Sequence, residues 1–142
     1  MSTIEEIQQE IIEEFSLFDD WMEKYQYIID SGKTLSPLDA AYRTEELIIK
    51  GCQSQVWLRP IVKVDQVLFE ADSDAAIVKG LISLLVRVMS GQKVGEVAKA
   101  DLHFIDDIGM REHLSMTRSN GLSQMIKQMK NYAVVLERQS SN

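Results

Sequence analysis

The thiol of Cys52 is the side chain in this sequence best suited to nucleophilic chemistry. It is the only cysteine among 142 residues, and it lies in the segment GCQSQVWL at positions 51–58. One sulfur makes no internal disulfide and holds no metal cluster by itself, so the thiol is either an inert core side chain or a reactive one. Gly51 allows a sharp backbone path, and the polar neighbours Gln53, Ser54 and Gln55 favour a loop tip over a core position.

Two histidines and one arginine are the candidate companions of this thiol. A thiol hydrolase or peroxidase that uses Cys52 with His103 requires the imidazole within hydrogen-bond reach of the sulfur. No cysteine-protease signature surrounds either histidine, so we expect His103 to be partly buried and hydrogen-bonded, and His113 to lie at the surface. Arg118 keeps its charge at every pH, and a cation near a thiol favours the reactive thiolate.

The sequence contains too few ligand residues for a redox or metal centre. A redox pair requires a second cysteine. One cysteine and two scattered histidines are also too few to form a structural zinc site. We therefore expect no metal ion in this protein.

The charge and composition exclude other classes of protein. The net charge is −7 and the apolar fraction is 45%, which is typical of a globular domain. An acidic chain repels nucleic-acid backbones, and no run is long enough to span a membrane. The acidic N-terminus does not resemble a signal peptide. These features predict one cytoplasmic domain over residues 1–142 that binds neither nucleic acid nor membrane.

Helical periodicity opens the chain. Thr3 and Glu6 form a capping box before an amphipathic helix. A second helix is expected to start near Asp19 and to end at Gly32. Its expected inward side chains are Trp21, Met22, Tyr25, Ile28 and Ile29.

The middle of the chain changes to the alternating pattern of strands. Ser36 and Pro37 first indicate a short helix through residue 43. A turn is expected at Asp65 and Gln66, and Pro60 fits a strand end or an edge strand. The three expected strands are residues 47–49, 54–59 and 67–70.

Helices return after the strands. Ser73 is a good N-cap for a helix over residues 75–90 that is apolar on nearly all sides and therefore central to the fold. Short helices are expected over 94–98 and 105–114, and a last long helix starts near Ser119. This order predicts an α+β fold, with helices packed on one face of a small antiparallel sheet.

Three motifs, in order along the chain, resemble those of the SufE family of sulfur acceptors, which includes the CsdE proteins. The first motif is GCQSQVWL at 51–58. The second is FEADSDA at 69–75, followed by KGLI at 79–82. The third comprises Leu114, Ser115 and RSNGL at 118–122. The resemblance covers essentially the whole chain, and one departure is Leu47, where the family usually has an asparagine.

The resemblance implies a fold shared with the iron–sulfur scaffold proteins of the IscU type, with Cys52 on a loop and its sulfur turned toward an apolar pocket. It implies that Cys52 accepts sulfur as a persulfide from a pyridoxal-phosphate-dependent cysteine desulfurase of the SufS or CsdA type. The chain would stimulate that enzyme and pass sulfur to a scaffold complex of the SufBCD type. It would act as a carrier without a cofactor of its own, not as a stand-alone enzyme.

The motifs also supply the residues expected at the site. Arg118 is the candidate that stabilises the thiolate. The residues expected to contact the partner are Gly51, Gln53, Ser54, Gln55, Asp74 and Asn120. A regulatory module with a passive cysteine is the alternative from the class of binding proteins.

Overall fold

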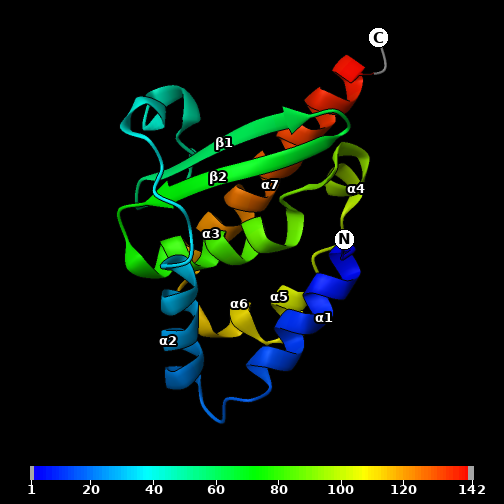
Figure 1. Ribbon diagram of the computed structural model, residues 1–142. Helices are drawn as coiled ribbons and strands as arrows, with labels where there is room; N and C mark the ends of the chain where they lie inside the picture. The colour runs from blue at the N-terminus through cyan, green and yellow to red at the C-terminus, as the bar shows by residue number, and fades with distance from the viewer. Residues whose placement is uncertain (1, 141–142) are drawn as a thin grey trace.

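A three-stranded antiparallel sheet lies along one side of the molecule, and helices pack against one of its faces (Figure 1). The computed structural model describes residues 2–140. This arrangement confirms the expected α+β fold. The elements are α1 (Ile4–Phe15), α2 (Trp21–Gly32), the 3₁₀ turns η1 (Ala40–Tyr42) and η2 (Glu45–Leu47), β1 (Val56–Lys63), β2 (Gln66–Ser73), α3 (Ala76–Met89), β3 (Gln92–Lys93), α4 (Val94–Lys99), α5 (Phe104–Asp107), α6 (Met110–His113) and α7 (Met116–Ser140).

Strands β1 and β2 form the main hairpin, and β2 is the central strand of the sheet. The hairpin turn consists of residues 64–65, one residue earlier than expected, because Lys63 pairs with Gln66. Val64 takes a φ of 58° in this turn, which is rare for a β-branched residue. Pro60 lies inside β1, where the edge position makes the missing N–H tolerable.

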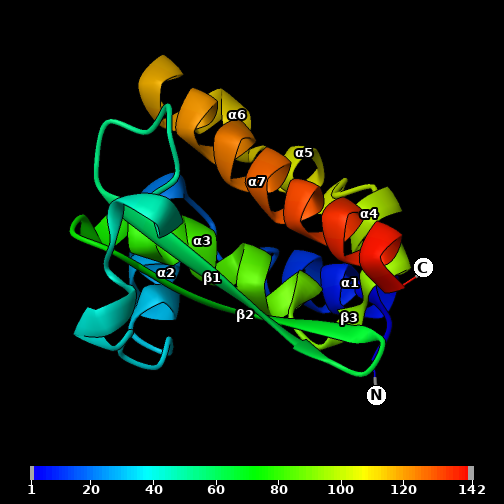
Figure 2. The same ribbon diagram turned by 90° about the horizontal axis from the view of Figure 1, so that it is seen from above.

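Helix α3 is the centre of the core and lies between the hairpin and α7 (Figure 2). Its sequence, apolar on nearly all sides, predicted this position, and ten of its residues are buried. Helix α2 crosses it at Gly80, where a Cβ atom would fall 2.1 Å from the carbonyl oxygen of Ile28. No side chain fits between the two helices at this crossing.

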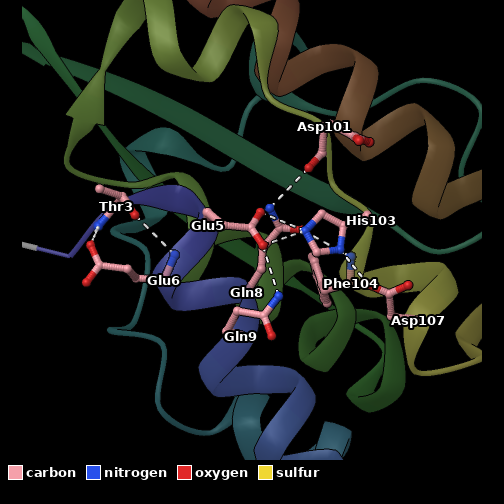
Figure 3. A network of polar contacts seen from close by, with 9 residues as sticks. All are labelled: Thr3, Glu5, Glu6, Gln8, Gln9, Asp101, His103, Phe104 and Asp107. Carbon is pink, nitrogen blue, oxygen red and sulfur yellow. Dashed lines mark hydrogen bonds and ion pairs between the residues drawn. The ribbon is translucent and has the colours of Figure 1, made fainter.

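Helix α1 is attached to the segment that precedes α5 by a network of polar contacts (Figure 3). The helix begins with the expected capping box of Thr3 and Glu6. Gln8 is buried, and its side-chain nitrogen donates to the carbonyl oxygen of Asp101 at 3.0 Å. Its side-chain oxygen accepts from the backbone N–H of Phe104 at 3.0 Å. The buried amide is thus satisfied on both of its polar atoms.

Some expectations in the first half of the chain are wrong. Residues 47–49 are not a strand, because Ile48 makes only an isolated bridge to Trp57. The helix expected after Pro37 is only the turn η1, which begins after Asp39. Met22 does not point inward; it is 83% exposed.

Other expectations differ at the ends of helices. Ser73 is the last residue of β2, and α3 begins three residues later. The helix expected over 105–114 is two short helices, separated by Gly109 in the left-handed conformation. Helix α7 begins at Met116, three residues before the expected Ser119. Strand β3 was not expected, since two residues are too few to show a period.

Candidate functional site

Cys52 lies on a loop of residues 50–54, called the Cys52 loop below, that joins η2 to β1. The N–H of Ile49 donates to the carbonyl oxygen of Val56 at 2.8 Å, just before and after the loop. The N–H of Gln55 donates to a carboxylate oxygen of Asp74 at 3.1 Å. Within the described residues, no backbone–backbone hydrogen bond ties residues 50–54 to another helix or strand. The loop therefore has fixed ends and a tip that can move without breaking such bonds.

The position of Gly51 requires glycine for two reasons. Its φ is +86°, a conformation that residues with a Cβ atom rarely adopt. A Cβ atom here would also lie 2.9 Å from the side-chain Cγ of Gln124 on α7. The backbone next to Cys52 thus passes directly against the Gln124 side chain.

The Cys52 thiol is half-buried between this loop and the first turns of α7. Its Sγ lies 3.6 Å from the carbonyl oxygen of Gly121, which it contacts as a weak hydrogen-bond donor. Burial raises the pKa of the Cys52 thiol above its ordinary value of 9.0. The thiol is therefore protonated at neutral pH and is a weak nucleophile in this resting conformation.

A cavity of about 80 Å³ opens beside the sulfur. Its walls combine apolar side chains from α3 and α7 with polar side chains from the Cys52 loop. The apolar part of the wall covers one side of the sulfur and limits its contact with water. The lining includes Cys52, Gln53, Ser54, Leu81, Met125 and Arg118.

Arg118 lies on the first turn of α7 and is the one charged side chain among the described residues that line the cavity. Its guanidinium donates a hydrogen bond to the hydroxyl of Tyr25 on α2. The same guanidinium lies 5.9 Å from the centre of the Tyr25 ring. Within the described residues, no hydrogen bond or ion pair joins Arg118 to Cys52. In the resting structure the positive charge is therefore directed at the phenol and not at the thiol.

The structure also brings Gln55 and Asp74 together at the base of the Cys52 loop. The carbonyl oxygen of Gln55 accepts from the Ser73 hydroxyl at 2.8 Å and from the N–H of Asp74 at 3.3 Å. With the bond from the Gln55 N–H to the Asp74 carboxylate, three contacts join the loop to the end of β2. These contacts fix the loop's C-terminal end.

Asp72, which precedes Ser73 in β2, is a residue near the site that the sequence analysis did not single out. It is 4% exposed and forms ion pairs with Arg43 and with Lys79, the latter at 3.3 Å. Its place in the FEADSDA motif was the one signal that could have pointed to it. A buried carboxylate requires partners, and Arg43 and Lys79 are those partners. Through these ion pairs Asp72 links the end of β2 to α3 and to the residue that follows η1.

The remaining expected site residues divide into two groups. Gly51, Gln53 and Ser54 lie with Cys52 on the loop, and Gln53 and Ser54 line the cavity with Arg118. Asn120 is exposed on α7 and does not line the cavity. It lies beside Gly121, the residue whose carbonyl contacts the thiol.

Neither histidine lines the Cys52 cavity. His103 uses one ring nitrogen for Asp107, at 2.5 Å, and the other for Glu5, at 2.7 Å (Figure 3). His113 stacks on the ring of Trp21, with 4.1 Å between the ring centres. Because both nitrogens of His103 are bonded elsewhere, it is not placed as a base for Cys52. Within the described residues, no group of three or more possible ligands forms a metal site.

Residues 9–133 match the SufE family, which is described as an Fe-S metabolism associated domain. The chain belongs to the SufE family. An uncharacterized SufE-like protein of Rhizobium meliloti (strain 1021) is 39% identical over 129 residues, which cover 87% of this chain and 92% of that protein. A second such protein, from Rhizobium etli, is 40% identical over 131 residues, 89% of this chain and 88% of that one.

A plant relative has a longer chain. The SufE-like protein 1, chloroplastic/mitochondrial, of Arabidopsis thaliana is 39% identical over 130 residues. The match covers 91% of this chain and only 35% of the plant protein. The shared part is thus one segment of that relative.

A solved structure has the same fold. The solution structure of a hypothetical protein from Thermus thermophilus matches with a TM-score of 0.73 and 17% identity, over 89% of this chain and 93% of that one. None of the helices in the described residues combines the length and apolar character that a membrane span requires. Membership of the SufE family gives this chain a sulfur-transfer role in iron–sulfur metabolism.

Proposed function

We propose that the 142-residue chain acts as one sulfur-acceptor domain in which Cys52 receives sulfur from the persulfide of a cysteine desulfurase of the SufS or CsdA type. The observation that carries this proposal is the half-buried thiol on a loop whose ends are fixed and whose tip has no backbone hydrogen bond to another helix or strand. Such a loop can shelter its sulfur at rest and present it to a partner. The SufE membership supports sulfur as the group transferred.

The transfer step is a thiol exchange. The Cys52 thiolate attacks the outer sulfur of the donor persulfide, so that a new S–S bond forms at Cys52 while the donor's S–S bond breaks. The donor cysteine leaves as a thiolate, and the proton of the Cys52 thiol goes to solvent or to a base of the donor. A second thiol nearby would attack the new persulfide and release sulfide. The chain has no second cysteine, which protects the transferred sulfur.

Docking moves the Cys52 loop outward, with Gly51 as the hinge. Gln53 and Ser54 at the tip and Asn120 beside it contact the desulfurase in this proposal. Gln55 and Asp74 hold the base of the loop during the movement and border the same surface. Arg118 then stabilises the thiolate in the docked state.

The chain is in this proposal a carrier and an activator, not a stand-alone enzyme. Removing sulfur from the desulfurase frees that enzyme for another turnover, which accounts for stimulation. The persulfide is then passed to an iron–sulfur scaffold complex of the SufBCD type. We place this activity in the cytoplasm, and no cofactor of the chain itself takes part.

The test is to incubate the protein with a desulfurase and L-cysteine and to measure its mass under non-reducing conditions. The wild type should gain about 32 Da, one sulfur atom, on Cys52. The Cys52→Ser variant should gain nothing and should not stimulate sulfide release, while its thermal unfolding remains close to that of the wild type. A wild type that gains no sulfur, or a serine variant that stimulates fully, would show a passive cysteine and refute the transfer.

A further inference from the structure

The contact between Arg118 and Tyr25 joins two helices that are far apart in the sequence. The two residues are separated by 93 positions, and the phenol oxygen accepts a hydrogen bond from the guanidinium. The Tyr25 ring is partly buried and packs against the core, so its hydroxyl has a fixed position on α2. The ring face adds an attraction for the cation at 5.9 Å.

We propose that Tyr25 is a positioning residue that holds the Arg118 guanidinium against α2, away from the Cys52 thiol, until a partner docks. This proposal rests on the proposed function only in saying that docking of a sulfur donor releases Arg118. The contact itself, and its effect on the thiol, are properties of the free protein. Tyr25 is thereby assigned a role in setting when Cys52 becomes reactive.

The arrangement of the cavity supports this role. Arg118 lines the same cavity as Cys52, so its side chain borders the space beside the sulfur. In this proposal a change of side-chain rotamer turns its charge toward the sulfur. Among the described residues, the carbonyl oxygen of Gly121 is the hydrogen-bond partner of the thiol at rest, and a carbonyl oxygen does not favour a thiolate. A phenol suits this role because it accepts one hydrogen bond from the guanidinium without forming an ion pair that would be costly to break. Releasing Arg118 therefore requires the loss of one hydrogen bond and a weak ring contact.

The test uses Tyr25→Phe, which removes the hydroxyl and keeps the ring. The matched control is Tyr27→Phe on the same helix, whose hydroxyl is bonded to Glu14 and which does not line the Cys52 cavity. The pH profile of alkylation by iodoacetamide reports on Cys52 alone, since the chain has one cysteine. In Tyr25→Phe the midpoint should fall by about one pH unit. Alkylation at neutral pH should rise roughly threefold, because a lower pKa also makes a thiolate less nucleophilic.

A second pair of variants separates the charge from other effects. Arg118→Ala should leave the midpoint near the wild-type value, and adding it to Tyr25→Phe should abolish the downward shift. An unchanged midpoint in Tyr25→Phe overturns the proposal, as does an equal shift in Tyr27→Phe or one that survives the loss of Arg118. Thermal unfolding of each variant shows whether the fold has been destabilised. A fall in the alkylation midpoint that comes with such destabilisation also counts against the proposal.

These outcomes are independent of sulfur transfer. If the midpoint shifts as expected but no sulfur reaches Cys52 from a desulfurase, the positioning role stands and the proposed function fails. If sulfur reaches Cys52 and the alkylation midpoint does not move, the proposed function stands and the positioning role of Tyr25 fails.

Discussion

The Cys52 thiol loses part of its hydration in the resting fold, and its neighbours offer it a carbonyl oxygen instead of a cation. Burial disfavours the charged form of any acid, which explains the raised pKa of Cys52. In this state the thiol should react slowly with free thiols or oxidants. The proposed sulfur transfer therefore requires that the thiol be activated when the partner docks.

This burial predicts slow modification of the native thiol. Iodoacetamide should alkylate Cys52 several-fold more slowly in the folded protein than in the urea-unfolded protein at neutral pH, because less thiolate is present and the sulfur is partly covered. Mass spectrometry over a time course measures both rates. Equal rates in the two states would contradict the half-buried position. A thiol-containing peptide of residues 50–54, added to both samples, controls for the effect of urea on the reagent.

At the residue scale the sequence predicted the loop position of Cys52 but not the surroundings of its thiol. Cys52, Gly51 and the polar loop follow from residue type and order, since each is a local property. The partnership of Tyr25 with Arg118 depends on how α2 and α7 pack. No local pattern contains that information, and Tyr25 was expected only to point inward.

At the scale of elements, the sequence predicted a helix end correctly where the residues that form it lie within one short segment. The capping box of Thr3 and Glu6 is such a case, because the donor and acceptor lie within one turn. The apolar run at 47–49 predicted burial but not a strand. Ile49 is 5% exposed, yet the segment makes only the isolated bridge between Ile48 and Trp57 and no continuous pairing with β1. A strand requires a partner of matching length, and apolar character cannot supply one.

The crossing of α2 and α3 gives a prediction at this scale. Gly80→Ala should destabilise the protein by about 1–3 kcal/mol, because the new methyl group meets the backbone of Ile28 and forces the helices apart. Urea unfolding measures the loss. Gly95→Ala on α4 is the matched control, since its new Cβ meets only a carboxylate oxygen of Glu137 at the end of a flexible side chain.

The control should be neutral or should gain up to about 1 kcal/mol from alanine's higher helix propensity. A Gly80→Ala variant as stable as the wild type would mean that the two helices separate easily at this crossing.

At the scale of the whole molecule, His103 links the first helix to the second half of the chain. The carboxylate of Asp107, and then that of Glu5, raises the pKa of His103 above its ordinary value of 6.5. A group with a raised pKa in the folded state binds its proton more tightly there than in the unfolded chain. Its contribution to stability is therefore complete below its ordinary pKa of 6.5 and is lost as the pH rises through the raised value.

The matching experiment compares the wild type with His103→Asn by urea unfolding across this pH range. The wild type should be the more stable protein in acid, by less than about 1 kcal/mol for so exposed a group. The difference should shrink as the pH rises through the raised pKa. A difference that is constant with pH would show that His103 acts through packing or uncharged hydrogen bonds alone.

The anchors on either side of the Cys52 loop set a limit on how far the sulfur travels. Three positions separate Cys52 from Ile49 and three separate it from Gln55, whose N–H groups are both bonded. An extended chain advances about 3.3–3.6 Å per residue, so the Cα atom of Cys52 stays within roughly 10–11 Å of each anchor. A donor that stores its sulfur at the bottom of a longer channel must bridge the remaining gap with a flexible arm of its own.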